Sequence, residues 1–187
     1  GKGCGGIFRS MSREDKTGLV HIYCGDGKGK TTAAVGQALR CAGGGGRVLF
    51  FQFLKSNVSG ERSALGSIDG IELRDGPDDM KFVWNMTDEE KAGAREYYMK
   101  RFRELCAEAG DFDMLVLDEV IPALKYDFVP AEELLEFLRS KPDGLEVVMT
   151  GREPEKRLVE LSDYVTEMKK IKHPFDRGVA MRKYIEI

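Results

Sequence analysis

The stretch Cys24-Gly25-Asp26-Gly27-Lys28-Gly29-Lys30-Thr31-Thr32 follows a short apolar run at residues 19–23 and leads into a helical pattern at residues 32–39. A strand, a glycine-rich loop and a helix in this order are the context in which phosphate-binding loops occur. The glycines let several backbone N–H groups converge on one point, where the helix adds its positive dipole end. Cys24 stands where the usual pattern has its first glycine, so the loop is a variant. The alternative interpretation is a solvated Gly/Lys turn.

This loop predicts an ATP site with a magnesium ion. The Lys30 side chain is spaced to reach the β- and γ-phosphates, and the Thr31 hydroxyl is spaced to bind Mg²⁺. We therefore predict ATP as a co-substrate, Mg²⁺ as its counter-ion, and Lys30 and Thr31 as catalytic residues. The predicted ATP-binding residues of the loop are Gly25, Asp26, Gly27, Lys28, Gly29, Lys30, Thr31 and Thr32.

The composition is that of one ordinary globular domain. The chain has 187 residues, 33% of them charged, and a net charge of −3 without a long run of Lys or Arg, which argues against a nucleic-acid partner. No apolar run approaches the roughly 18–20 residues that a membrane span needs, and no signal-peptide pattern is present. The four cysteines lie far apart without a Cys-x-x-Cys pair, which favours reduced thiols and a cytoplasmic location.

Strand and helix patterns alternate along the chain. A capping box at Thr87 and Glu90 opens the longest predicted helix, and the apolar face of the first helix is expected at Val35, Ala38, Leu39 and Ala42. Strands are predicted at residues 19–23, 47–53, 71–73, 112–119, 145–150, 164–168 and 184–187, and helices at 32–42, 87–109, 130–141 and from 154.

This alternation predicts an α/β fold with a mostly parallel sheet covered by helices on both faces. We expect a single P-loop NTPase-like domain of the RecA-like kind over residues 18–187. Residues 1–17 are predicted to be a flexible leader or an expression-derived segment.

The polar residues that follow the predicted strands are expected to form one site, because ligands of such sheets bind at the carboxyl ends of the strands. Asp118 and Glu119 follow an apolar run, a Walker B arrangement that predicts Mg²⁺ binding together with Thr31. The alternative is an acid pair that starts a helix. Arg152 follows the next strand and is predicted to hold a phosphate oxygen. Glu119 suits either a hydrolase or a kinase as a catalytic group, so these residues leave the reaction open.

Seven motifs occur in an order that resembles the P-loop corrinoid adenosyltransferases, over roughly residues 18–187. They are Gly25-Asp26-Gly27-Lys28-Gly29-Lys30-Thr31-Thr32-Ala33-Ala34, Gln52-Phe53-Leu54-Lys55, Phe82-Val83-Trp84, Leu117-Asp118-Glu119, Thr150-Gly151-Arg152, Val165-Thr166-Glu167-Met168 and Lys172-His173-Pro174-Phe175.

The resemblance implies transfer of the 5′-deoxyadenosyl group of ATP to the Co(I) of a reduced corrinoid, with release of triphosphate, in adenosylcobalamin biosynthesis or salvage. It implies that the variant loop is normal for this class and binds ATP with its phosphates reversed relative to ordinary ATPases. It also implies a homodimer in which an amino-terminal arm covers the partner's site, and it leaves room for a flavoprotein as the electron donor. The amino-terminal segment is where this chain matches least.

Phe82 and Trp84 precede the long helix. In an extended segment alternate residues point the same way, so both rings are expected to face one ligand. The resemblance places them under the corrin ring, where they displace the lower axial ligand of cobalt. The alternative is that both rings anchor a loop on the core.

Two other classes of function stay open on the residues alone. One is a P-loop ATPase that remodels nucleic acid or protein, and the other is a non-catalytic switch gated by ATP.

Overall fold

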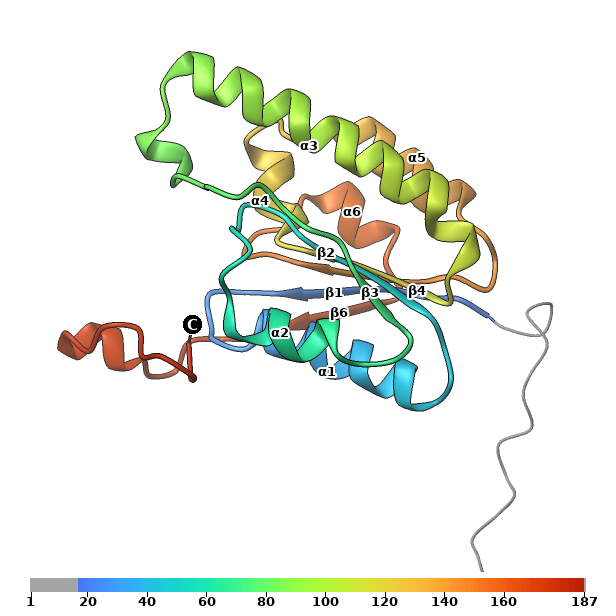
Figure 1. The fold of residues 1–187 in the computed structure, drawn as a ribbon, viewed down its shortest axis with the longest axis horizontal. Helices are drawn as coiled ribbons and strands as arrows, with labels where there is room; N and C mark the ends of the chain where they lie inside the picture. The colour runs from blue at the N-terminus through green and yellow to red at the C-terminus, as the bar shows by residue number, and fades with distance from the viewer. Residues whose placement is uncertain (1–16, 187) are drawn as a thin grey trace, which may run out of the picture.

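The computed structural model describes residues 17–186, which form a single parallel sheet covered on both faces by helices (Figure 1). The strand order is β3-β2-β4-β5-β1-β6, and every neighbouring pair is parallel. The predicted α/β class is therefore confirmed, whereas the predicted leader lies, apart from Thr17, outside the described residues. The strands are β1 (Val20–Cys24), β2 (Val48–Gln52), β3 (Ile71–Leu73), β4 (Met114–Asp118), β5 (Glu146–Thr150) and β6 (Tyr164–Glu167).

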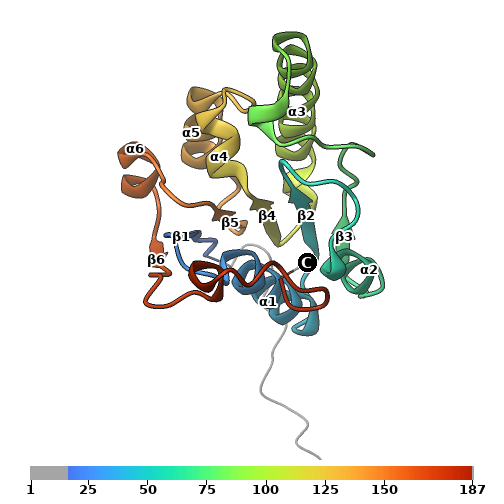
Figure 2. The ribbon, with the colours of Figure 1, turned by 90° about the vertical axis from the view of Figure 1, so that its left-hand side faces the viewer.

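The helices form two layers, one on each face of the sheet (Figures 1 and 2). Helices α1 (Lys30–Gly43) and α2 (Gly60–Gly66) cover one face. The other face carries α3 (Asp88–Glu108), α4 (Val120–Lys125), α5 (Ala131–Ser140) and α6 (Lys156–Glu160). Short 3₁₀ turns lie at Val83–Asn85, Ala109–Asp111 and Pro174–Arg177.

Burial on both faces explains the composition of the central strands. All five residues of β2 and all five of β4 are buried. A strand between two helical layers exposes neither face to water, so it reads as a continuous apolar run instead of an alternating one. Across the part of the chain that the structure describes, no helix combines the length and apolar character needed to cross a membrane.

Three sequence predictions differ from the structure. The strand predicted at residues 184–187 does not form over its described part, residues 184–186, because Tyr184 has a left-handed φ of 71° and a turn is closed between Arg182 and Glu186. Leu39 is 50% exposed, so it does not belong to the buried face of α1, which Ala34 and Ala38 form. Helix α4 was not predicted, because it is only six residues long and carries a proline in its first turn, where no N–H partner is lost.

The predicted capping box at the start of α3 is confirmed. The Thr87 hydroxyl accepts a hydrogen bond from the Glu90 backbone N–H at 3.1 Å, and the Glu90 carboxylate accepts one from the Thr87 N–H at 3.1 Å. These two bonds satisfy backbone donors at the first turn of α3. Further along the helix, Tyr98, Phe102 and Leu105 pack into the core.

We expect Thr87→Ala to lower the free energy of unfolding by about 1 kcal/mol, because the Glu90 backbone N–H loses the hydroxyl that accepts its hydrogen bond. Urea unfolding measures the change. Thr87→Ser is the matched control, since serine keeps the accepting hydroxyl. Equal midpoints for the alanine and serine variants would show that the box does not stabilise this helix.

Candidate active site

The glycine-rich loop is held against the segments that follow β5 and β6. The Gly25 N–H donates to the Arg152 carbonyl at 2.9 Å, and the Gly27 N–H donates to the Met168 carbonyl at 2.6 Å. A Cβ on Gly25 would lie 2.4 Å from the Met168 oxygen, and Gly25 has a left-handed φ of 97°. A side chain at this position would therefore collide with backbone and also strain its own backbone.

Cys24 is the last residue of β1, and its side chain packs in the hydrophobic core at 7% exposure. The left-handed turn begins one residue later, at Gly25. This position therefore needs no glycine, which is the physical reason that the loop tolerates the variant.

The carboxylate of Asp26 fastens the loop. It accepts a hydrogen bond from the Lys170 backbone N–H at 2.8 Å, and this bond is the main cause that lowers the pKa of Asp26. Asp26 was predicted as an ATP-binding residue. In the structure its carboxylate is bound to the protein's own backbone.

Lys30 begins α1, directly after Gly29, and its ammonium donates to the Gly27 carbonyl at 2.8 Å. Burial, followed by the field of Arg152, lowers the pKa of Lys30, while the negative charge of Glu119 opposes this change. The start of α1 and the carboxyl ends of β4 and β5 thus bring three charged residues of the predicted site, Lys30, Glu119 and Arg152, close enough to interact electrostatically.

Thr31 and Asp118 meet as the strand-end rule predicts, although they lie 87 residues apart. The Thr31 hydroxyl donates to Asp118 Oδ1 at 3.0 Å. The Asp118 side chain is fully buried and also accepts a hydrogen bond from the Thr150 hydroxyl at 2.7 Å. Of the two predicted acids, Asp118 is the one that contacts Thr31.

Three further residues complete this cluster, and the strand-end rule predicts all three for the same site without giving any of them a specific role. Lys55 Nζ lies 3.1 Å from Asp118 Oδ2 and 3.2 Å from the Thr31 hydroxyl oxygen. The Gln52 amide donates to Asp118 Oδ2 at 3.2 Å, and Thr150 supplies the hydroxyl described above. The signal that locates all three is their position at or just after the carboxyl ends of β2 and β5.

Glu119 has an unusual backbone and a displaced pKa. It adopts the left-handed conformation, with φ 60° and ψ 24°, and its N–H donates to the Thr150 hydroxyl at 2.8 Å. Such strain in a residue with a Cβ costs about 1–3 kcal/mol and is concentrated at functional sites. Burial, with a smaller contribution from the charge of Asp118, raises the pKa of Glu119.

We expect Glu119→Gln to stabilise the fold at neutral and alkaline pH and to leave it unchanged in acid. A carboxyl whose pKa is raised in the folded state binds its proton more tightly there than in the unfolded chain, so ionisation above the ordinary value of 4.5 costs stability. Glutamine carries no such cost. Urea unfolding at about pH 4 and about pH 8 measures the difference. A difference that is equal at both pH values would contradict ionisation as its cause.

Phe82 and Trp84 lie beside each other on the turn before α3. Their rings stack at a centroid distance of 4.6 Å and an interplanar angle of 7°, with 62% and 72% of the residues exposed. The predicted extended segment is wrong, since Val83–Asn85 is a 3₁₀ turn, yet both rings project to the same side. The interpretation that the rings anchor the loop is also wrong, because Val83, at 6% exposure, is the anchor.

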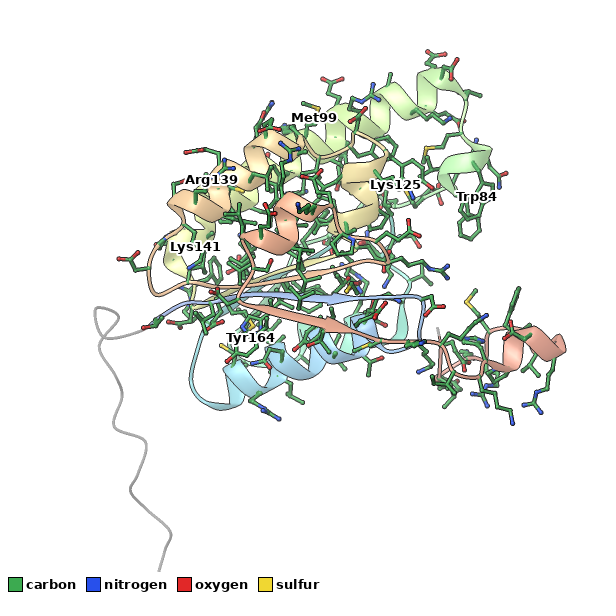
Figure 3. All side chains as sticks on the ribbon, turned by 180° about the vertical axis from the view of Figure 1, so that it is seen from behind. Trp84, Met99, Lys125, Arg139, Lys141 and Tyr164 are labelled. Carbon is green, nitrogen blue, oxygen red and sulfur yellow. The ribbon has the colours of Figure 1, made fainter. Side chains whose placement is uncertain are left out.

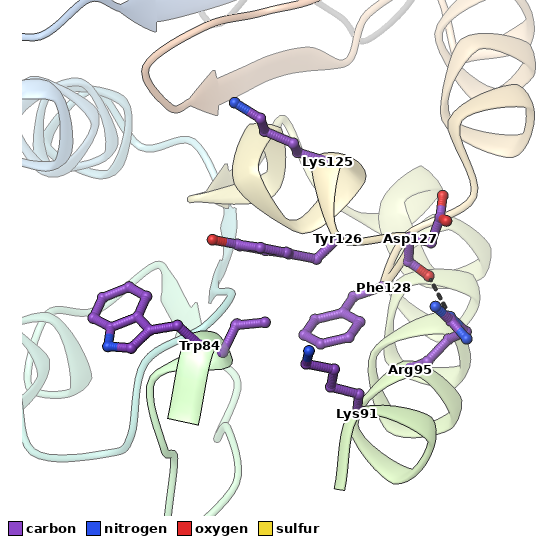
Figure 4. Close-up of a pocket in the computed structure, with 8 residues that line it drawn as sticks. Trp84, Lys91, Arg95, Lys125, Tyr126, Asp127 and Phe128 are labelled. Atoms are coloured by element: carbon purple, nitrogen blue, oxygen red, sulfur yellow. Dashed lines mark hydrogen bonds between the residues drawn. The ribbon is translucent and has the colours of Figure 1, made fainter. Parts of the chain in front are cut away.

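The aromatic pair lies at the end of the molecule where the strands have their carboxyl ends (Figure 3). Next to Trp84 is a pocket of about 270 Å³ between the 3₁₀ turn, the start of α3 and the end of α4 (Figure 4). Arg95 lines the pocket on the side away from Trp84 and donates to the Asp127 carbonyl at 3.1 Å. The pocket is lined by Val83, Trp84, Lys91, Arg95, Lys125, Tyr126, Asp127 and Phe128.

A parallel sheet with a glycine-rich loop after β1 and a Thr31–Asp118 pair at the carboxyl ends of its strands defines a P-loop nucleotide-binding protein. The family model described as ATP:corrinoid adenosyltransferase BtuR/CobO/CobP matches residues 16–187. The chain belongs to this family of corrinoid adenosyltransferases, as the motif order indicates.

Named relatives agree with this assignment. The chain is 36% identical to a corrinoid adenosyltransferase of Escherichia coli over 174 residues, which cover 91% of this chain and 86% of that protein. It is 32% identical to a corrinoid adenosyltransferase of Salmonella typhimurium over 179 residues, or 95% of this chain and 90% of that protein.

Among solved structures, a KaiC-like protein of Pyrococcus horikoshii aligns at 16% identity and a TM-score of 0.47, over 82% of this chain and 74% of that one.

Proposed function

We propose that this protein transfers the 5′-deoxyadenosyl group of ATP to the Co(I) of a reduced corrinoid and releases triphosphate. The observation that carries the proposal is the combination, at one end of the sheet, of a cationic phosphate loop with an exposed, stacked aromatic pair. The loop suits a polyphosphate, and the rings suit a large planar ligand. Family membership supplies the reaction.

The reaction needs stabilisation of a leaving group more than it needs a base. Co(I) supplies the electron pair that forms the cobalt–carbon bond, and the bond between C5′ and the triphosphate oxygen breaks with its electrons going to triphosphate. Lys30, Lys28, Arg152 and the loop N–H groups other than those of Gly25 and Gly27, which bond backbone carbonyls, neutralise that developing charge. Preorganised donors of this kind contribute most where they do not have to reorient.

The residues at the loop also suit Mg²⁺. A hydroxyl from Thr31 and a carboxylate from Asp118 are the hard oxygen ligands that this ion takes, and phosphate oxygens and water complete its shell in such sites. Among the described residues, no group of three or more His, Cys, Asp or Glu side chains is placed to hold a metal ion. When bound, the ion supplies positive charge to the leaving triphosphate.

Phe82 and Trp84 are proposed to lie under the corrin ring and to displace the lower axial ligand. Loss of that donor lowers the energy of the cobalt orbital that accepts the electron, which makes Co(II) easier to reduce. Each rise of 59 mV in the reduction potential changes the one-electron equilibrium about tenfold. The exposure of both rings supports this role, because buried rings would have no free edge or face for a ligand.

A homodimer, a flavoprotein electron donor and a cytoplasmic location belong to the same proposal. The carboxyl-terminal segment supports an interface, because several large apolar side chains along it are exposed. They are Ile171, Phe175, Val179, Met181, Tyr184 and Ile185.

Product analysis tests the function. The protein is incubated with ATP, Mg²⁺ and a chemically reduced corrinoid under strict anaerobiosis, while the visible spectrum reports the cobalt–carbon bond. We expect an adenosyl-corrinoid and one triphosphate per turnover. Phosphate with ADP would instead indicate a remodelling ATPase, and unchanged ATP would indicate a switch.

A further inference from the structure

The ammonium of Lys55 lies in the place where a P-loop protein holds its divalent cation. Lys55 Nζ is 3.1 Å from Asp118 Oδ2 and 3.2 Å from the Thr31 hydroxyl oxygen, so it bridges the two side chains that suit Mg²⁺. The Thr31 hydroxyl donates its hydrogen to Asp118 and accepts from Lys55. The Thr31 hydroxyl oxygen and Asp118 Oδ2 can bind a metal ion together only if the Lys55 ammonium moves away from them.

The backbone directs Lys55 into this position. Leu54, the residue before it, has a left-handed φ of 58°, which is unfavourable for a residue with a side chain. The Leu54 N–H donates to the hydroxyl of the buried Tyr98 at 3.2 Å, so the core holds the strained turn. This strain is a second, independent sign that the position of Lys55 is constrained for function.

The two partners of this ion pair differ in their freedom to move. The Asp118 side chain is fully buried, whereas 31% of the Lys55 side chain is exposed. Asp118 also accepts bonds from Thr150 and Gln52, which keep it in place. Lys55 is therefore the partner that can swing toward the solvent, where the loop would hold a triphosphate.

We propose that Lys55 substitutes for the divalent cation in the free protein and moves onto the triphosphate when metal and ATP bind. The proposal rests on the proposed ATP and Mg²⁺ site and adds a residue to it. In the free protein the ammonium compensates the buried charge of Asp118, which would otherwise be unpaired. In the complex the metal ion compensates the charge of Asp118, and the Lys55 ammonium binds the leaving triphosphate as a further positive charge.

One consequence is thermodynamic coupling between metal and nucleotide. Metal without nucleotide must displace Lys55 into water, whereas metal with triphosphate gives Lys55 a new anionic partner. Each ligand therefore strengthens binding of the other, and couplings of this kind are typically about 5–150-fold. Removal of Lys55 should act on the two separate affinities in opposite directions.

The test measures Mn²⁺ binding to the nucleotide-free protein by electron paramagnetic resonance, and ATP binding in excess EDTA by calorimetry. Relative to the unchanged protein, Lys55→Met is expected to bind Mn²⁺ about tenfold more tightly and metal-free ATP about tenfold more weakly. Lys30→Met is the matched control, since it removes the same charge from the same site but its ammonium bonds the Gly27 carbonyl. It should weaken ATP binding and change Mn²⁺ affinity less than about threefold.

Equal Mn²⁺ affinities for the unchanged protein and Lys55→Met would overturn the proposal. A gain in Mn²⁺ affinity for Lys30→Met as large as that for Lys55→Met would overturn it too, because general repulsion would then be the cause. Thermal unfolding checks that each variant is folded. If Lys55→Met is not, Lys55→Gln, which keeps a polar side chain without the charge, must show the same two shifts. The Mn²⁺ measurement needs neither ATP nor corrinoid, so a failure of the proposed transferase reaction leaves it decisive.

Discussion

Lys30→Ala is expected to lower kcat/KM for adenosyl transfer by about 10²–10³-fold, the loss typical when one preorganised donor to a developing negative charge is removed. Lys30 begins α1 and is partly buried beside Glu119 and Arg152. Triphosphate leaves with the electron pair of the broken C5′–O bond, so its charge grows in the transition state. The lysine charge therefore matters for the rate as well as for ATP affinity.

Steady-state assays with Co(I) supplied chemically measure this loss. Lys156→Ala is the control, because Lys156 is a surface residue of α6 whose ammonium pairs with Glu160 on the same helix. It removes one lysine from the protein without touching the loop. Near-normal turnover of Lys30→Ala at saturating ATP would refute the assigned role in the transition state.

Trp84→Ala is expected to lower the rate that starts from bound Co(II) at least about tenfold more than the rate that starts from chemically prepared Co(I). A tenfold difference corresponds to a fall of about 59 mV in the reduction potential of the bound cobalt. The exposed rings of Phe82 and Trp84 stack on each other, so removal of the indole also takes away the support of the phenyl ring. A corrinoid with its lower ligand still bound would be harder to reduce.

Parallel assays that start from Co(II) and from Co(I) measure the two losses separately. Val83→Ala is the control, because Val83 lies between the two aromatic residues in the sequence but is buried in the core and anchors the turn. Its loss should reduce both rates together. Equal losses of rate for Trp84→Ala in the two assays would mean that the indole only stabilises the turn and does not affect the reduction of cobalt.

Local sequence determines the phosphate loop and its surroundings. Glycines at 25 and 29 have left-handed φ values of 97° and 112°, and glycine is the residue type that adopts such conformations without a steric cost. The meeting of Thr31 with Asp118 was predictable despite their separation, because a parallel sheet gathers the carboxyl ends of its strands at one edge. Apolar runs predicted the six strands of the sheet, and the spacing of Thr87 and Glu90 predicted the capping box.

Predictions failed where a contact between distant elements decided the outcome. Periodicity assigned Leu39 to the buried face of α1, but the sheet lies against Ala34 and Ala38. The apolar residues from Tyr184 onward suggested a strand, yet a strand needs a partner, and Tyr184 instead lies in a turn. Phe82 and Trp84 were expected to share a direction through extended alternation, and they do so through a 3₁₀ turn and mutual stacking.

The sequence by itself therefore determined the fold class, the loop and the family, because those depend on residue type and on order along the chain. Only the tertiary structure decided the position of the Lys55 ammonium between Thr31 and Asp118, and the strained backbone of Glu119. The physical reason is that these features depend on where β2, β4 and β5 end relative to one another and on what the buried Asp118 needs for its charge. Neither condition is visible in the spacing of any single motif.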